Sequence, residues 1–204
     1  MPINGECQYR NSLPGVLFHD RIAAMSQITP DETLLGLLAA QARHGYQLLE
    51  CFRDPAQLGE VWNLSTSQLY AVLKRLCQQG SISGQTADSP DGPTRTEYTL
   101  TPSGQAQLQA WLEDEHPSPS IRRVRVEFLS RLYIARLLNL PTIPLVLRQK
   151  RACQQHLAEL LAQRYLVPPG IGYLTLDLVI AQLEAVLGWI DRCELVPINF
   201  EEEE

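Results

Sequence analysis

The stretch from Ser65 to Gly80 places the tightest constraint on the fold, because it carries its own start and stop signals and has two different faces. Ser65 is a suitable helix N-cap, and Gln68 three residues later can complete a capping box. Gly80 supplies the positive-φ residue that commonly ends a helix. The stretch therefore predicts one well-bounded helix.

The two faces of this helix differ in chemistry. One sector of about 100° is apolar, which predicts a core-facing stripe; it consists of Leu69, Val72, Leu73 and Leu76. The opposite sector is small, polar and locally basic; it holds Ser67, Ala71, Lys74 and Gln78, flanked by Gln68, Tyr70 and Arg75. An ordinary amphipathic helix with a solvated face accounts for this window alone. The surrounding segments decide whether the polar face binds a partner.

Two helices are predicted before this segment. Thr29 as N-cap, Pro30 in the first turn and two following acids predict a helix from Glu32 to about Ala42. Its residues are apolar almost all round, which predicts a central place in a small core. A second helix is predicted from about Gly45 to Arg53. It places three large side chains on one face, namely Tyr46, Leu49 and Phe52.

A β-hairpin and a fourth helix are predicted after Gly80. Residues 81–85 and 94–101 alternate as strands do, and the turn-forming residues 88–93 separate them. Thr101-Pro102 then repeats the Thr-Pro helix start, and an apolar stripe continues through Glu115, with Leu108, Trp111 and Leu112. Three helices, a hairpin and a helix form the order of a winged helix-turn-helix module, whose third helix enters the major groove of DNA.

A proline-serine stretch at 117–120 predicts a linker, after which the chain is helical. Helices are predicted for 121–138, 142–166 and 174–195. Three helices contain too little chain to bury all of their apolar sides by themselves. We therefore predict that two copies pair as a homodimer. The side chains predicted at its interface are Leu157, Leu160, Leu161, Leu176, Val179, Leu183, Val186, Leu187 and Ile190. The predicted fold is mostly α with a small β-hairpin: an extension over 1–28, a winged helix-turn-helix domain over 29–116, an all-α dimerisation domain over 121–197 and an acidic tail over 198–204.

Composition and charge restrict the partners of the chain. No run approaches the roughly 18 apolar residues of a membrane span, so we expect a cytoplasmic protein without a membrane partner. The five scattered cysteines lack metal-site spacing, and we expect reduced thiols and no metal or cofactor. The net charge is −6, and residues 30–115 hold five Lys/Arg against 11 Asp/Glu, whereas residues 116–200 hold 10 against 6. This acidic N-terminal half weakens the attraction of nucleic acid, whose binding depends on local positive potential.

Several motifs together resemble the PadR family of bacterial transcriptional regulators, over residues 31 to about 136 and more loosely to 195. The resemblance rests on Leu35-Gly36-Leu37-Leu38, His44-Gly45-Tyr46, Leu69-Tyr70-x-x-Leu73-Lys74-Arg75-Leu76-x-x-x-Gly80, Tyr98-Thr99-Leu100-Thr101-x-x-Gly104 and Arg125 to Leu132. It implies a dimeric, mostly repressing regulator with a helical dimerisation domain that often responds to a small molecule. Two places depart from the family pattern, Ser67-Gln68 and the wing strand Arg95-Thr96-Glu97-Tyr98, and the wing change weakens phosphate attraction.

The leading hypothesis is a regulator that binds a palindromic operator in double-stranded DNA as a homodimer. We expect Ser67, Gln68, Tyr70 and Lys74 to reach base edges or nearby phosphates, because a glutamine can read adenine bidentately. Arg75, Arg95 and His44 are expected to hold the backbone. The alternative is a winged-helix module that binds protein and has weak or no DNA binding, which the acidic domain and the unusual wing favour.

Catalysis is not expected, because the four histidines lack a neighbouring nucleophile or metal pattern and no phosphate-binding glycine loop is present. His44 is expected to begin a helix rather than act as a base. A small-molecule effector is a further expected partner. Trp111 and Trp189 are candidates for lining its cavity, although aromatic residues in a helical stripe are more often plain core.

Overall fold

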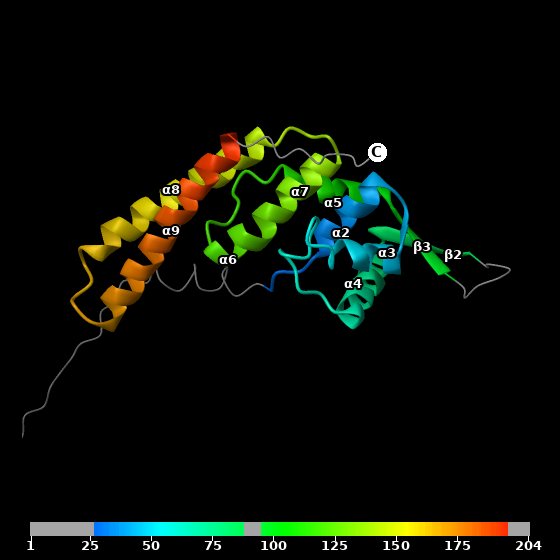
Figure 1. The fold of residues 1–204 in the computed structure, drawn as a ribbon, viewed down its shortest axis with the longest axis horizontal. Helices are drawn as coiled ribbons and strands as arrows, with labels where there is room; N and C mark the ends of the chain where they lie inside the picture. The colour runs from blue at the N-terminus through cyan, green and yellow to red at the C-terminus, as the bar shows by residue number, and fades with distance from the viewer. Residues whose placement is uncertain (1–26, 88–94, 196–204) are drawn as a thin grey trace, which may run out of the picture.

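The structure is a computed structural model that describes residues 27–87 and 95–195. The predicted acidic tail, the hairpin turn at 88–93 and nearly all of the N-terminal extension fall outside these ranges. Figure 1 shows the sheet and helices α2 to α5 at one end of the molecule, the α8–α9 hairpin at the other, and α6 and α7 between them. The mostly helical fold with a small antiparallel sheet agrees with the sequence prediction.

Four helices build the winged-helix core: α2 (Asp31–Ala40), α3 (Gly45–Cys51), α4 (Thr66–Gln78) and α5 (Pro102–Leu112). Their buried leucines form one cluster, which includes Leu34, Leu48, Leu69, Leu73 and Leu108. The nearly all-apolar α2 lies at its centre, as predicted. The helix start differs in one detail, because Pro30 rather than Thr29 occupies the N-cap position and makes no side-chain cap.

The sheet has three strands, β1 (Arg43–His44), β2 (Ile82–Ala87) and β3 (Arg95–Leu100), in the antiparallel order β1-β3-β2. The hairpin of β2 and β3 forms the predicted wing, with Ile82 opposite Leu100. The short β1 was not predicted: the chain between α2 and α3 pairs Arg43 with Tyr98. This pairing joins the base of the wing to the start of α3.

One helical segment after the linker contacts both halves of the molecule. It consists of α6 (Ile121–Arg123), a π-helical turn over Val124–Phe128 that we call the π turn, and α7 (Leu129–Leu137). Val124 and Phe128 are buried with the C-terminal helices, whereas Ile134 is buried in the winged-helix core. The predicted division at 117–120 stays a prediction, and the packing shows that α7 contributes to both cores.

Helices α8 (Ile143–Arg164) and α9 (Ile171–Leu195) pack along each other as a hairpin. Of the predicted dimerisation residues, Leu160, Leu183 and Ile190 are buried inside the single chain, so their burial needs no second copy. The other six are partly buried against the same core. The large apolar side chains of the hairpin that are most exposed are instead Tyr165, Leu166, Ile171, Leu174 and Leu178.

Helix α9 requires a correction to the expectation about membrane spans. Over Ile171–Cys193 it is long and apolar enough to cross a membrane by length and composition alone. The sequence prediction missed this helix because it looked for an unbroken apolar run, and scattered polar residues divide the apolar residues of α9 into short runs. Two of its carboxylates are paired with α8, however: Asp191 lies 2.8 Å from Lys150 Nζ and Asp177 lies 2.8 Å from Arg164 Nη2. Exposed ion pairs along the hairpin argue against a lipid-facing helix.

Candidate nucleic-acid interface

The polar face of α4 is exposed, as the sequence predicts for a recognition helix. Ser67, Tyr70, Ala71, Lys74 and Gln78 are all exposed, while the apolar stripe on the opposite side is buried. Ser65 caps the helix, and Gly80 follows it with a φ of 73°. The helix is therefore fixed at both ends by local bonds while one face remains free.

Gln68 forms the predicted capping box. Its Oε1 accepts a hydrogen bond of 2.9 Å from the Ser65 N–H, and the Gln68 N–H donates to Ser65 Oγ at 3.3 Å. The amide oxygen that bidentate adenine reading requires is thus already bonded within the cap. This geometry assigns Gln68 to helix stability first, and base reading by Gln68 stays a prediction that would require the cap to open.

Arg75 lies at the edge of the exposed face and is paired with Asp31 at the start of α2. The Arg75 side chain is 41% exposed, and that of Asp31 is 13% exposed. This ion pair joins two residues 44 positions apart in the chain and neutralises much of the positive charge that Arg75 would offer a phosphate. A backbone contact by Arg75 stays a prediction, and a phosphate would have to compete with Asp31 for this guanidinium.

A crevice of about 500 Å³ lies between the start of α3, the middle of α4 and the wing. It combines two predicted backbone-binding side chains, His44 and Arg95, with three tyrosines, Tyr46, Tyr70 and Tyr98. His44 precedes α3 as its N-cap, as expected, and its ring Nδ1 lies 3.3 Å from the Thr96 carbonyl oxygen. This crevice, which we call the wing crevice, has the residue types that hold a phosphate oxygen.

Two residues of this surface were missed by the sequence reading. Tyr46 was placed on an apolar face but is 62% exposed, because α3 turns that side of its first turn toward the wing crevice. Arg53 is exposed and its Nη2 donates a 3.2 Å hydrogen bond to Thr66 Oγ1 at the start of α4. No sequence pattern distinguished either residue, because both positions depend on how α3 packs against α4.

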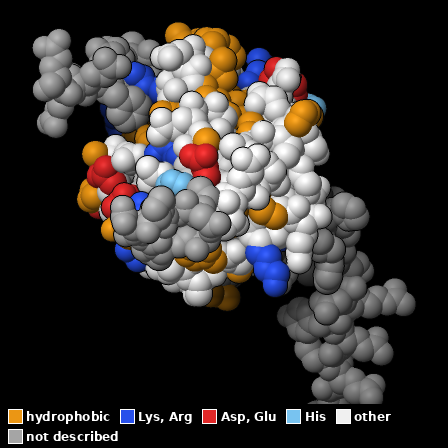
Figure 2. Space-filling model, turned by 90° about the vertical axis from the view of Figure 1, so that its right-hand side faces the viewer, with side chains coloured by type: hydrophobic (Ala, Val, Ile, Leu, Met, Phe, Trp, Pro, Cys, Tyr) orange, Lys and Arg blue, Asp and Glu red, His pale blue; other side chains and the backbone are white. Residues whose placement is uncertain are grey.

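Charges on the wing end of the molecule are mixed. Figure 2, which views this end, shows Lys and Arg side chains scattered among Asp and Glu rather than gathered in one patch. This agrees with the acidic balance of residues 30–115.

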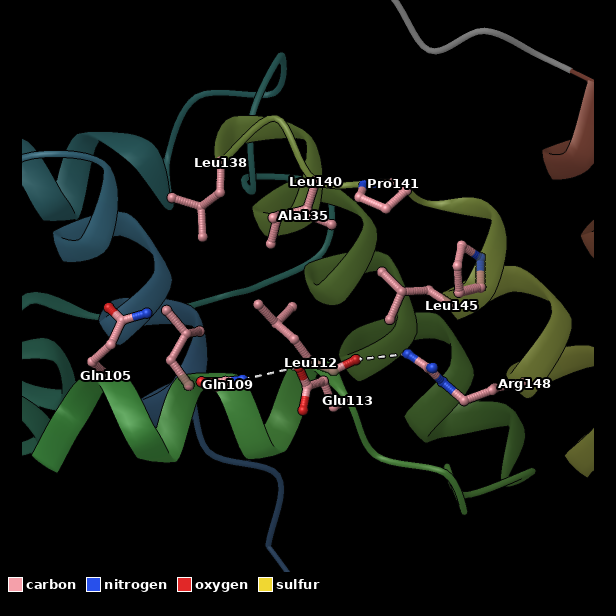
Figure 3. Close-up of a pocket in the computed structure, with 12 residues that line it drawn as sticks. Gln105, Gln109, Leu112, Glu113, Ala135, Leu138, Leu140, Pro141, Leu145 and Arg148 are labelled. Atoms are coloured by element: carbon pink, nitrogen blue, oxygen red, sulfur yellow. Dashed lines mark hydrogen bonds between the residues drawn. The ribbon is translucent and has the colours of Figure 1, made fainter. Parts of the chain in front are cut away.

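A second cavity, of about 370 Å³, lies between α5, the end of α7 and the start of α8. Figure 3 shows Ala135, Leu138 and Leu140 on one side, the α5 side chains on the other, and Arg148 at one end. Arg148 Nη2 donates to the Leu112 carbonyl oxygen at 2.9 Å, while its Nε is buried and has no hydrogen-bond partner within the described part of the chain. We call this the α5–α8 cavity: its walls are mostly apolar, and its charged lining residues are Glu113 and Arg148, whose Nη1 also lies 3.3 Å from Glu115 Oε1.

Neither tryptophan predicted to line an effector cavity lines this one. Trp111 lies under the guanidinium of Arg131, whose carbon is 5.3 Å from the ring centre. Trp189 packs edge-on against Phe128 with ring centres 6.1 Å apart. Both therefore serve as packing residues, the interpretation that the sequence favoured.

The described cysteines are free thiols. Burial raises the pKa of Cys51, Cys77, Cys153 and Cys193 above the ordinary thiol value. These groups are accordingly less ionised near neutral pH than an ordinary exposed thiol, which makes them poorer nucleophiles.

Comparison with known proteins identifies the family of the domain that carries this surface. Residues 34–110, which include all of α4 and the described wing, match the model of the transcriptional regulator PadR-like family. This domain belongs to the PadR-like family. The family is one of transcriptional regulators rather than enzymes, in agreement with the expectation that the chain is not an enzyme.

One curated relative of the PadR-like domain is the negative transcriptional regulator PadR of Bacillus subtilis (strain 168), which is 34% identical over 100 residues. The match covers 49% of this chain and 53% of that protein, so the chain spans about half the length of this relative.

Solved structures of PadR proteins are also similar to the chain. Bacillus subtilis PadR in complex with operator DNA has 25% identity and a TM-score of 0.41, covering 80% of this chain and 94% of that one. The same protein in complex with p-coumaric acid has 25% identity and a TM-score of 0.39, covering 80% and 95%. A PadR-like regulator from Bacillus cereus has 18% identity and a TM-score of 0.38, covering 80% and 94%.

Proposed function

We propose that this protein is a sequence-specific DNA-binding transcriptional regulator that acts as a repressor. The observation that carries the proposal is the α4 helix of a PadR-like domain, capped at both ends, buried on one side and exposed on its polar side next to the wing crevice. A helix of this kind enters the major groove, while the wing lies along the backbone. The name of the Bacillus subtilis relative, a negative transcriptional regulator, supports repression.

The exposed side chains divide between two roles. Ser67, Tyr70 and Lys74 face outward on α4 and are placed to contact base edges or adjacent phosphates. His44 and Arg95 line the wing crevice and are placed to bind the backbone. Phosphate contacts position the protein without reading sequence, so these two groups have distinguishable effects on specificity.

The test is a gel shift of the full chain on its own upstream region at controlled salt, with random duplex as the comparison. The variant Lys74→Ala with Arg95→Ala should weaken binding, and its log-affinity against log-salt slope should fall in magnitude by about 1 for each lost contact. Arg151→Ala, which removes an exposed arginine on α8, is the matched control. Unchanged affinity and slope in the double variant would show that this surface does not bind DNA.

The alternative function is a winged-helix module that binds protein, which the acidic balance of residues 30–115 favours. The same gel shift separates the two functions. A wild-type protein that binds neither its upstream region nor random duplex at low salt would support the alternative.

A homodimer is the assembly that we propose, with cytoplasmic location. The α8–α9 hairpin leaves Leu174 and Leu178 62% and 58% exposed, and Ile171 at the start of α9 is 82% exposed. A second copy of the same hairpin would cover such a surface, and two-fold dimers are the commonest homo-oligomers. Binding of a palindromic operator follows from that symmetry.

A small-molecule effector is the third part of the proposal, and the α5–α8 cavity is its site. The cavity touches α5 of the PadR-like domain and both α7 and α8, so a ligand there would contact both halves of the molecule. Its apolar walls and Arg148, whose exposed partner Glu115 a ligand would replace, suit an apolar molecule with one carboxylate. p-Coumaric acid, which is bound in a structure of Bacillus subtilis PadR, has that chemistry and serves as the probe. Titration calorimetry should show binding to the wild type and at least a tenfold loss in Arg148→Gln; equal affinities would place any effector elsewhere.

A further inference from the structure

The five Lys/Arg against 11 Asp/Glu in residues 30–115 leave a question about where the positive charge for a duplex comes from. Several arginines follow the linker in α6, the π turn and α7, and two of them already have carboxylate partners. Arg123 Nη1 lies 2.6 Å from Glu127 Oε1, and Arg131 Nη2 lies 2.9 Å from Asp114 Oδ2.

Arg122 and Arg125 differ from these neighbours. Both are exposed, and neither makes an ion pair or hydrogen bond within residues 27–87 and 95–195. They therefore offer two guanidinium groups that can bind an external anion without breaking an internal pair. Arginine suits phosphate particularly well, because its planar fork can donate two hydrogen bonds to one phosphate group.

Arg122 lies beside the recognition helix although it is 44 or more residues away from it in sequence. It lines a cleft of about 470 Å³ together with Gln68, Ala71 and Arg75 of α4. The wing crevice lies on the other side of α4, where Tyr70 lines it. Figure 1 accordingly shows α6 and α4 on the same side of the molecule, with the wing beyond α4. The exposed face of α4 is thus flanked by the wing on one side and by α6 on the other.

Hydrogen bonds fix this placement. Trp62, in the turn that leads to α4, donates from Nε1 to Ser130 Oγ at 2.8 Å. Ser130 in turn donates to the Val126 carbonyl oxygen of the π turn at 2.7 Å. Ser130 is fully buried, so the hydroxyl group that makes both bonds has no access to water. The π turn is consequently held against the helix-turn-helix, and α6 keeps its position next to α4.

We propose that Arg122 and Arg125 form a second phosphate-binding surface, which contacts the backbone of the same DNA duplex that α4 enters, on the side of α4 away from the wing. This inference rests on the proposed function. A duplex carries one negative charge per about 1.7 Å of its axis, so phosphates extend past both sides of the groove that a recognition helix enters. The charge that the PadR-like domain lacks is then supplied by the segment after the linker.

The test uses the full-length variant Arg122→Gln with Arg125→Gln. Fluorescence anisotropy measures its binding to the upstream duplex and to random duplex between 50 and 200 mM salt. The slope of log affinity against log salt should fall in magnitude by about 0.9 for each lost contact, or roughly 4 for a dimer. A fourfold rise in salt should then cost the wild type roughly 100-fold more affinity than the variant. The change should be equal on both duplexes, since phosphate contacts carry no sequence information.

The matched control is Arg151→Gln, which removes the same charge from an exposed position on α8. It should keep the wild-type slope, and all variants should keep the wild-type melting temperature. If Arg151→Gln lowers the salt slope by as much per residue as Arg122→Gln with Arg125→Gln does, the change in net charge explains the effect and the inference is wrong. A loss confined to the upstream duplex would also overturn it, because that result indicates base reading.

Failure of this inference is distinguishable from failure of the proposed function. The double variant Arg122→Gln with Arg125→Gln could keep the wild-type salt slope while Lys74→Ala with Arg95→Ala binds DNA more weakly. That result would rule out the second surface and still support DNA binding by α4 and the wing. A wild-type protein that binds no duplex at low salt would overturn both proposals.

Discussion

Gly36→Ala tests the packing that holds α7 against the winged-helix core. Gly36 lies in the middle of α2 and is buried. A methyl group added there would lie 2.4 Å from Ile134 Cγ2 and 2.8 Å from Ile134 Cγ1 and Cδ1. Ile134 is itself fully buried in the core, so it has little room to move away. Accommodating the methyl group therefore requires α2 and α7 to separate.

Two effects of opposite sign decide the result. Alanine is favoured over glycine in a helix interior by about 1 kcal/mol, which stabilises the variant. Overpacking of a core costs about 1–3 kcal/mol, which destabilises it. We expect overpacking to win, with a net loss of about 1–2 kcal/mol in the free energy of unfolding. For a chain of this length each kcal/mol corresponds to about 2–4 °C in melting temperature.

The assay is urea unfolding followed by circular dichroism, at one protein concentration because assembly affects apparent stability. Gly188→Ala is the matched control: it lies within α9, is exposed, and has no atom within 4 Å of the added methyl group. It should gain up to about 1 kcal/mol. A second variant, Ile134→Ala, removes all three clashing atoms and should cost about 2–5 kcal/mol alone.

The double variant Gly36→Ala with Ile134→Ala should lose less than the two single losses together, by about 1–2 kcal/mol, because the clash is absent. A Gly36→Ala protein that is more stable than the wild type, as Gly188→Ala is expected to be, would refute the close contact between α2 and α7.

Three further outcomes follow from the geometry. Gln68→Ala should lower the free energy of unfolding by about 0.5–2 kcal/mol through loss of the cap, and it should weaken binding to the upstream duplex and to random duplex by the same factor. A loss of binding confined to the upstream duplex, at an unchanged melting temperature, would instead show base reading. Leu178→Glu, at a position 58% exposed on α9, should convert the dimer to a folded monomer in light scattering, and a persistent dimer would place the interface elsewhere. Cys153 is fully buried and burial raises its pKa, so less of its thiol is ionised at pH 8; it should react with a thiol reagent more slowly than Cys77, and equal rates would contradict the buried placement.

Local signals in the sequence determined the element at the centre of the site. Ser65, Gln68 and Gly80 specify the ends of α4 through bonds and dihedral angles that involve residues a few positions apart. The apolar stripe of α4 and the alternation in the wing strands likewise have short periods, so they can be read without knowing the fold. Helix order and motif spacing were then sufficient to predict a winged helix-turn-helix and a likeness to PadR regulators.

Tertiary structure alone decided which polar side chains remain available. Arg75 looked like a free cation in the sequence, but Asp31 is brought to it across 44 residues. Arg122 looked like one arginine among many, but the bond between Trp62 and Ser130, 68 residues apart, places its helix beside α4. Ion pairs and clefts of this kind depend on the relative positions of packed helices, for which no short-range period exists. The sequence therefore determined where the recognition helix begins and ends, and the packing of α2, α6 and α7 decided which charges accompany it.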